Sequence, residues 1–389
     1  MKSTLLVTIC LLLIASAHSL WGRRRRRRCN PQNCQVGQWV PWSRCNLACG
    51  DYGTQRRTRI KTRSEKCGGK CDLALIQVRG CNRRPCARNL KHRLEYAARA
   101  LAPLVFLHKS ETFRPSDVDF FLRHVNMVNS RGQKTCNRPT LTSSNLCSGH
   151  KNDYLKTKVT LKSPSSVNAR VLRGISSSFV KAYAIIKTTK NRYYDIYYWL
   201  FYPYNRGKRV CIGLKPKLIG CIGGYSTFGH HVGDWEHVTI RLNWNMEPLQ
   251  LYVSAHNFGT RYNYDKHTGV FRSGNRVLAM HDSHPVVYSA LGSHGMWDRP
   301  GTHTYKKLFN GEKLQDKTNA GHKWYTWGNL MVTPYGEWNG RAYFFRYLGR
   351  WGNKKSGCKL SEKFAGECIL NSGPTGPAAK STMSKDPIE

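Results

Sequence analysis

The 389-residue chain is poor in acidic side chains, with 22 Asp and Glu against 63 Lys and Arg, and its formal net charge is +41. It contains no Asn-X-Ser/Thr sequon, so N-glycosylation is not expected. After residue 19 it has no apolar run near the roughly 20 residues that a membrane-spanning helix needs. The excess of cations predicts an anionic partner: glycosaminoglycans or another extracellular polyanion, a mineral surface, or the lipid head groups of a membrane. We do not expect nucleic acid as the partner.

Residues 1–19 have the pattern of a secretory signal peptide. An apolar stretch from Leu5 to Ala15 follows a basic residue, and Ala17 and Ser19 are the small residues of a cleavage site. The alternative, a membrane anchor, needs a longer apolar run. The pattern predicts a secreted, extracellular protein. Its basic segment, 20–28, contains six consecutive arginines and is a candidate for removal by a basic-site protease.

The cysteines predict an oxidising compartment. One of the fifteen lies in the signal segment, and the remaining even number is typical of disulfides. Eight of them fall in residues 29–88, a segment too short to depend on a hydrophobic core. The other six form three pairs with short separations, and we expect three local bridges: Cys136–Cys147, Cys211–Cys221 and Cys358–Cys368.

Composition divides the chain into a cysteine-rich module (29–88), a helical connector (89–100), a larger domain (101–375) and a flexible tail (376–389). Short β-rich runs separated by Gly, Asn and Pro predict that the larger domain is an all-β sandwich. These runs are Lys158–Leu161, Tyr193–Tyr202, His237–Leu242, Leu249–Val253 and Pro285–Ser289. The fold class is therefore expected to be mainly β.

The cysteine-rich module combines tryptophans with cations at every second residue. The residues concerned are Trp39, Trp42, Arg57, Arg59, Lys61 and Arg63. On a strand, alternate residues share a face, so the cations can stack on the indoles. Such a stack is either the substitute core of the module or a surface that binds polyanions, and the net charge of +9 over residues 29–88 supports the second role.

These motifs resemble a thrombospondin type-1 repeat. The match includes W-x-x-W-x-x-C ending at Cys45, then Cys49-Gly50, the R-x-R pattern, and the closing cysteines Cys81 and Cys86. The resemblance implies a thin three-stranded ribbon, with disulfides, that binds glycosaminoglycans or matrix. The chain departs from the family by one extra residue between Gly50 and the following glycine.

The candidate chemistry of the larger domain concentrates in one segment, Gly229 to Leu242, which contains two acidic residues close together. After Gly233 this segment alternates as a strand does, so Asp234 and Glu236 share a face, and His231 precedes them. Two carboxylates and a histidine suit a hard divalent cation such as Mg²⁺ or Ca²⁺. The alternative is a strand end with solvated acids.

Residues 101–375 resemble the family named after vacuolar protein sorting-associated protein 62. The matching motifs are Ala102–Glu111, Gly233–His237, Val253–His256, Pro285–Gly295, Gly349–Gly352 and Gly373–Pro377. The resemblance implies no defined biochemical activity.

A weaker similarity connects the same segment with the necrosis-inducing cytolysins. It implies a metal cradle of His231, Asp234 and Glu236, with Asn205 where that family has an aspartate, and a loop histidine at His256. The family also has a histidine where this chain has a glycine, directly before Asp234. The similarity implies metal-assisted binding of a glycan or lipid head group, with a cytolytic or defensive role.

The sequence is compatible with three functions. The leading interpretation is a secreted recognition protein that binds anionic glycans or membrane head groups. The second is an extracellular-matrix or mineral-associated structural protein. The third is a metal-dependent hydrolase, but the chain shows no Ser or Cys nucleophile motif and no general acid–base pair, so we do not expect an enzyme. His294 is either a further ligand-binding residue or a hydrogen-bonding residue of its loop, and the aromatic run Tyr193–Tyr204 is either core or a sugar-stacking surface.

Overall fold

A computed structural model describes residues 29–47, 49, 53–84, 89–161, 166–189, 193–216, 220–355 and 371–384. The predicted signal peptide, the basic segment 20–28, Cys86 and the expected Cys358–Cys368 bridge lie outside these residues. Contacts divide the chain into two compact units. One consists of the chain up to Val40 with Thr58–Ile76, and the other of Pro41–Arg57 with the chain from Gln77 onward.

The N-terminal module is a set of short strands held by disulfides. β1 (Gln35–Val36) pairs with β3 (Lys61–Arg63), and β2 (Thr54–Thr58) pairs with β4 (Ile76–Gly80). The bridges are Cys29–Cys67, Cys34–Cys71 and Cys45–Cys81, and Cys49 is also disulfide-bonded.

The cations of this module do not share one strand, contrary to the expectation. β2 ends at Thr58 and β3 begins at Lys61, so the run is broken at Arg59 and Ile60. The reason is a change of hydrogen-bonding partner. The Arg59 N–H donates to the Leu75 carbonyl, whereas the Ile60 carbonyl accepts from Gly37.

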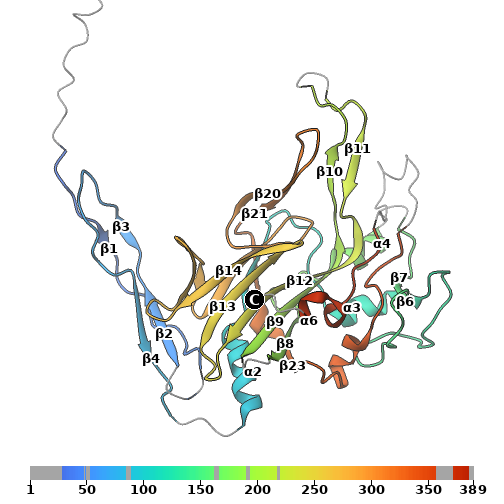
Figure 1. Cartoon of the computed structure of the whole chain (residues 1–389), viewed down its shortest axis with the longest axis horizontal. Helices are drawn as coiled ribbons and strands as arrows, with labels where there is room; N and C mark the ends of the chain where they lie inside the picture. The colour runs from blue at the N-terminus through green and yellow to red at the C-terminus, as the bar shows by residue number, and fades with distance from the viewer. Residues whose placement is uncertain are drawn as a thin grey trace, which may run out of the picture. The chain divides into compact units, whose positions relative to one another are not determined.

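An eight-stranded sheet with the order β16-β15-β14-β13-β12-β9-β8-β23 forms the centre of the larger unit (Figure 1). Its strands are β8 (Ala182–Thr188), β9 (Tyr194–Asn205), β12 (His231–Leu242), β13 (Pro248–Ala255), β14 (Phe258–Asp265), β15 (Val270–Ser273), β16 (Arg276–Val277) and β23 (Leu330–Pro334). The two longest strands, β9 and β12, are antiparallel neighbours. Every residue of β9 except its last is buried, so the aromatic run belongs to the core.

A second sheet has the order β17-β18-β5-β22, with β19 paired to β18. Its strands are β5 (Leu104–Leu107), β17 (Met280–His281), β18 (His284–Ser289), β19 (Met296–Trp297) and β22 (His322–Tyr325). One hydrophobic cluster unites side chains of this sheet, such as Val287 and Trp324, with Tyr198 of the large sheet. The two sheets therefore form the expected sandwich.

The opposite face of the large sheet is also covered. A second cluster packs Trp199 and Trp235 against Phe121 of α3 (Val118–Arg123) and Phe344 of η2 (Gly340–Arg346). The expected connector helix is present as α2 (Leu90–Ala100), and its alanines join the first cluster. No helix among the residues described here has the length and apolarity to cross a membrane.

Three hairpins and several short helices complete the larger unit. They are β6 (Val125–Val128) with β7 (Tyr154–Thr157), β10 (Lys208–Cys211) with β11 (Tyr225–Phe228), β20 (Gly301–Lys307) with β21 (Lys313–Thr318), α4 (Ser166–Arg173) and η1 (Thr326–Asn329). The expected strand Lys158–Leu161 is wrong. β7 ends at Thr157, because that residue's hydroxyl donates to the Val159 carbonyl and turns the chain.

The other four expected strands fall on β9, β12, β13 and β18. Two of the three expected local bridges, Cys136–Cys147 and Cys211–Cys221, are confirmed.

The expectation of a flexible tail from residue 376 is wrong for the part described. This segment contains η3 (Pro377–Ala379) and α6 (Ser381–Ser384), and Met383 is fully buried. The Met383 carbonyl accepts a hydrogen bond from Lys187 Nζ at 2.6 Å. The C-terminal segment is thereby packed against the sheet, and it places Lys380 beside the acidic residues of β12.

Candidate functional site

A cavity of about 680 Å³ opens beside the N-terminal half of β12. Its lining includes the predicted His231, Asp234, Glu236, Asn205 and His256, together with Tyr305 and Lys380. Antiparallel pairing sets His231 opposite Asn205, and this register brings the two residues to one end of the β9–β12 pair. The structure thus gathers the predicted metal and loop residues around one space, whereas His294 does not line it.

Asp234 is buried and fixed from behind by His294. The two side chains approach at 3.3 Å between Oδ2 and Nδ1, and the other ring nitrogen of His294 lies 3.0 Å from the Phe113 carbonyl. Burial acts to raise the pKa of Asp234, but the His294 hydrogen bond and nearby cationic groups outweigh it and hold the pKa below its ordinary value. His294 also stacks on Tyr202 at 3.9 Å. It is therefore a positioning residue for Asp234.

Glu236 and Lys380 place opposite charges in the same cavity. Burial and the neighbouring Asp234 raise the pKa of Glu236 well above its ordinary value. Burial lowers the pKa of Lys380, against the attraction of both carboxylates. Lys380 Nζ donates to the Trp235 carbonyl at 2.6 Å and lies 5.2 Å from the ring centre of Trp199. The ammonium thus provides a cation beside the two acids.

His231 is engaged through both ring nitrogens. Nδ1 lies 2.6 Å from the Gly233 carbonyl, to which it donates, and Nε2 then accepts from the Asn205 amide at 3.2 Å. Burial lowers the pKa of His231. The buried Asn205 Oδ1 has no hydrogen-bond partner. Gly233 has φ +70, and a side chain there would collide with the Trp351 carbonyl, which explains why this chain has no histidine before Asp234.

The predicted metal residues do not fit a metal in this arrangement. Among the described residues, three ligand atoms lie within 4.8 Å of one another only at Cys34, Glu65 and Cys71, and those cysteines are joined in a disulfide. His231 is already hydrogen-bonded at both nitrogens, and Lys380 supplies the positive charge.

Asp316, which sequence reasoning missed, organises the other side of the cavity. It is fully buried and accepts from His256 at 2.8 Å, Ser293 at 2.5 Å and Trp297 at 3.0 Å, and Lys208 Nζ lies 3.3 Å away. Burial acts to raise the pKa of Asp316, but these partners, His256 foremost, lower it to about 2. His256 is thereby oriented, and its ring also stacks on Tyr305 at 3.9 Å.

The sequence offered only weak signals for these additional residues. Asp316 is the acidic residue of β21, and a single acid in a basic strand does not by itself indicate a binding site. Lys380 lies in a polar, Pro- and Gly-rich segment that is typical of a disordered tail.

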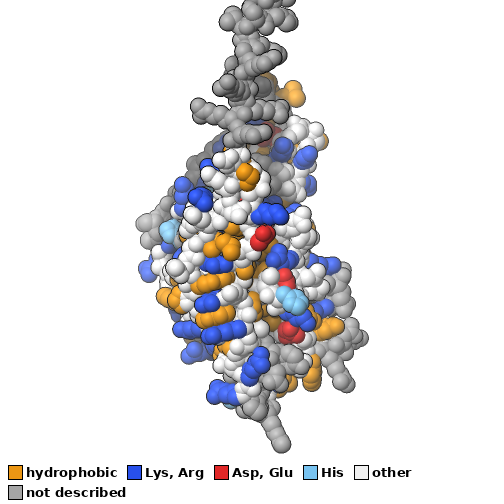
Figure 2. Space-filling model, turned by 90° about the vertical axis from the view of Figure 1, so that its left-hand side faces the viewer, with side chains coloured by type: hydrophobic (Ala, Val, Ile, Leu, Met, Phe, Trp, Pro, Cys, Tyr) orange, Lys and Arg blue, Asp and Glu red, His pale blue; other side chains and the backbone are white. Residues whose placement is uncertain are grey.

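The predicted cation stacking is present within each unit. In the smaller unit Arg59 lies 4.3 Å from the ring centre of Trp39. In the larger unit Arg57 and Arg79 lie 4.7 and 4.3 Å from that of Trp42. Figure 2 shows Lys and Arg side chains alternating with hydrophobic ones in a stack on one face. Arg79 was not predicted.

The two remaining predicted cations lie apart from the indole stacks. Lys61 forms an ion pair with Glu65 at 2.8 Å, and Arg63 is exposed on β3.

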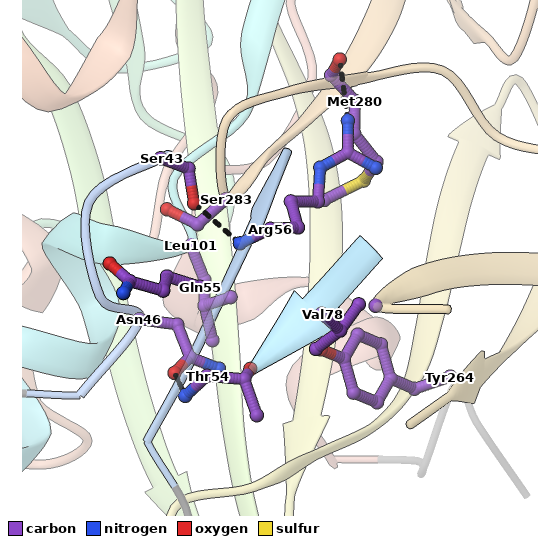
Figure 3. Close-up of a pocket in the computed structure, with 11 residues that line it drawn as sticks. Ser43, Asn46, Thr54, Gln55, Arg56, Val78, Leu101, Tyr264, Met280 and Ser283 are labelled. Carbon is purple, nitrogen blue, oxygen red and sulfur yellow. Dashed lines mark hydrogen bonds between the residues drawn. The ribbon is translucent and has the colours of Figure 1, made fainter. Parts of the chain in front are cut away.

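A second, small cavity, drawn in Figure 3, lies between packed segments of the larger unit. Its volume of about 20 Å³ holds no more than a water molecule. Arg56 crosses it and donates to the Met280 and Asp282 carbonyls, and its backbone N–H donates to Ser43 Oγ. Burial lowers the pKa of Arg56. This cavity fixes residues 41–57 to the sandwich and has no room for a ligand.

Fold and cavity together define a mainly β protein in which a disulfide-rich basic module precedes a sandwich with an acidic cavity. The family model described as vacuolar protein sorting-associated protein 62 matches residues 27–320, and the chain belongs to this family. The match starts at residue 27, directly before the basic module, whereas the sequence motifs began near residue 101.

Two relatives from Saccharomyces cerevisiae match most of the chain. The putative vacuolar protein sorting-associated protein TDA6 is 25% identical over 325 residues, which are 72% of this chain and 65% of the relative. Vacuolar protein sorting-associated protein 62 is 25% identical over 286 residues, which are 65% of this chain and 58% of the relative. The chain thus spans less than two thirds of the length of either relative.

A short stretch is similar to thrombospondin-type proteins. The human thrombospondin type-1 domain-containing protein 7A is 37% identical over 59 residues, 15% of this chain and 4% of that protein. SCO-spondin of Gallus gallus is 36% identical over 72 residues, 18% of this chain and 1% of that protein. No solved structure matches the chain. The similarity to necrosis-inducing cytolysins stays a prediction.

Proposed function

We propose that this protein binds sulfated glycans at extracellular surfaces, with the basic N-terminal module as its anchor. The observation that carries the proposal is the stacking of Arg57 and Arg79 on Trp42, and of Arg59 on Trp39. A stacked guanidinium is held in one plane before it meets a ligand, so little side-chain freedom is lost on binding. Its planar array of N–H groups matches the paired oxygens of a sulfate.

The charge of the module supports the same partner. Residues 29–88 contain twelve basic and three acidic side chains. Among the described pairs, Lys61 is partnered by Glu65, while the guanidinium of Arg59 makes its hydrogen bond to a neutral carbonyl, that of Ala74. The module therefore keeps most of its positive charge for a ligand. The disulfides of both units are consistent with an extracellular setting.

The cavity of the larger unit suits a different part of a glycan. Its volume of about 680 Å³ lies in the range of ligand sites. Asp234 and Glu236 offer hydrogen-bond acceptors to hydroxyl groups, and Tyr305 and the half-exposed Phe258 offer aromatic faces. We assign it an uncharged, hydroxyl-rich sugar unit, because carboxylates would repel a sulfate.

The experiment is heparin binding by the full chain, compared between two double variants of equal charge change. Arg57→Glu with Arg59→Glu alters the stacked cations, and Lys151→Glu with Lys156→Glu alters two exposed lysines of the β6–β7 hairpin. We expect the first variant to lose about tenfold or more in affinity, the equivalent of one charged contact or more. The second should stay within about twofold.

Equal losses in the two variants would refute the proposal. Binding would then depend on total charge alone, as expected for a matrix or mineral-associated structural protein.

A further inference from the structure

Two neighbouring hairpins of the larger unit expose large apolar side chains, most of them at or near the ends of the hairpins. Of the sixteen exposed large hydrophobic residues in the described chain, six lie on β10–β11 and β20–β21. They are Ile212, Leu214, Ile222, Tyr225, Phe228 and Phe309. Phe309 is 92% exposed and Leu214 is 70% exposed. Figure 1 shows both hairpins projecting from the same side of the large sheet.

We propose that these paired hairpins dock the protein on a membrane with anionic lipid head groups. The site goes beyond the proposed function, because its exposed apolar residues belong neither to the basic N-terminal module nor to the lining of the acidic cavity.

The two ends are joined into one rigid projection. The Asn310 side-chain amide donates to the carbonyls of Cys211 and Gly213, at 2.9 and 2.8 Å. Lys215 pairs with Glu312 across the same gap at 3.2 Å. These contacts keep the apolar side chains of both hairpins together, so they act as one surface.

The described residues of each end are also joined by internal contacts, and their apolar side chains are exposed. The Cys211–Cys221 disulfide closes the β10–β11 end, where the Ile222 N–H donates to the Leu214 carbonyl at 2.8 Å. In the β20–β21 turn, the Leu308 N–H donates to the Glu312 carbonyl, also at 2.8 Å. Such an end loses little conformational freedom when it enters a lipid interface.

Cations surround the apolar ends. The described residues of the two hairpins, 206–216, 220–229 and 301–318, hold eight basic and two acidic side chains. A cavity of about 460 Å³ lies at their base, and its lining includes Arg206, Lys208, Arg209, Lys313 and Lys317. One of these, Lys208, is paired with Asp316, whereas Lys313 and Lys317 are exposed. Exposed lysines beside an apolar end match an anionic head group above an apolar bilayer interior.

This arrangement favours a bilayer over a protein partner. Protein interfaces depend on a buried aromatic centre in a complementary pocket, and lysine is depleted there. Here the apolar residues lie at the ends of projecting hairpins, with lysines on their flanks. A polar rim with an apolar tip is instead the pattern of interfacial membrane anchors.

The test is sedimentation of the full chain with vesicles of phosphatidylcholine alone or mixed with phosphatidylserine. We expect binding to the mixed vesicles only, and loss of at least about tenfold in Leu214→Ser with Phe309→Ser. The matched control, Val277→Ser with Leu348→Ser, removes two other exposed apolar side chains, 48% and 46% exposed. The control should bind as the unmodified chain does.

A reporter variant shows whether the apolar end enters the bilayer. Tryptophan emission of Phe309→Trp should shift to shorter wavelength with mixed vesicles, and that of Val277→Trp should not.

No binding of the unmodified chain to mixed vesicles would overturn the proposal and leave a protein partner as the occupant. Equal binding by the hairpin variant and the control would overturn it as well. Heparin binding should persist in the hairpin variant, which separates this proposal from the glycan-binding one.

Discussion

Replacing Lys380 by Met tests whether the C-terminal segment supplies the cation of the cavity. The substitution keeps most of the apolar stem and removes the ammonium. That group donates to the Trp235 carbonyl at 2.6 Å and lies over Trp199. A charge-assisted hydrogen bond contributes about 1.5–3 kcal/mol, and a partly exposed cation–π contact adds about 0.5–1 kcal/mol. Burial of the ammonium offsets part of this gain, so we expect the free energy of unfolding to fall by about 1–2 kcal/mol at neutral pH.

The control is Lys187→Met, which breaks similar contacts outside the cavity. Lys187 Nζ donates to the Met383 carbonyl, also at 2.6 Å, and lies 5.6 Å from the ring centre of Tyr335. Its cross-strand neighbour Asp195 is already paired with Arg241 at 2.8 Å, and Lys187 does not line the cavity. Urea denaturation of both variants across pH therefore separates the loss of a hydrogen bond from the loss of a charge beside two acids.

The pH dependence has a defined sign. Glu236 has a raised pKa in the folded protein, so its ionisation reduces stability as pH rises from the ordinary value of 4.5. Lys380 opposes that rise in pKa, and its removal lets the pKa increase further. The stability lost in Lys380→Met should thus grow once pH exceeds the raised pKa of Glu236, whereas that in Lys187→Met should stay level.

The same variant tests the metal hypothesis. Without the ammonium, Asp234 and Glu236 are left as two adjacent carboxylates, which favour a hard divalent ion. Millimolar Mg²⁺ or Ca²⁺ should raise the melting temperature of Lys380→Met and leave the unmodified chain unchanged. If the unmodified chain is stabilised as much, or if the loss in Lys380→Met does not depend on pH, Lys380 is not the cation of this site.

Two further outcomes follow from other buried groups. Burial lowers the pKa of His237 to about 3, so its contribution to stability is present above pH 6.5 and is lost as pH falls toward 3. In His237→Gln, the free energy of unfolding should therefore fall by about 4 kcal/mol less over this pH range than in the unmodified chain. An unchanged dependence of unfolding on pH would contradict this. Asp316→Asn should lower the free energy of unfolding by about 3 kcal/mol at neutral pH, because Lys208 loses its carboxylate partner. The unmodified chain should lose stability as pH falls from 3.8 to about 2, and the variant should lose less over this range. A stable variant with unaltered chemical shifts of the His256 ring in NMR would show that Asp316 does not orient that ring.

The sequence predicted the sandwich and its strands because burial leaves a pattern. The aromatic run before Asn205 and the alternating segment after Gly233 are both core strands, and they are neighbours in the large sheet. The same alternation set Asp234 and Glu236 beside one cavity. Local cysteine pairs were equally readable, since a short loop leaves few alternative partners.

Long-range features left no comparable pattern. Lys380 reaches the cavity because the C-terminal helices pack near β12. Its hydrogen bond to the Trp235 carbonyl joins residues that are 145 positions apart in the sequence. The break at Arg59 depends on a change of strand partner, which periodicity does not encode. The metal hypothesis followed from the types of its residues, and it did not include the lysine that lines the same cavity.

The most direct measurement of the central claim is surface-based binding of the full chain to heparin, N-desulfated heparin and hyaluronan at the same ionic strength. The stacked arginines should give binding that weakens with loss of sulfate and with added salt, and hyaluronan, which has carboxylates but no sulfate, should bind at least about tenfold more weakly than heparin. Equal affinity for heparin and hyaluronan would contradict the account, because the module would then respond to negative charge without recognising sulfate.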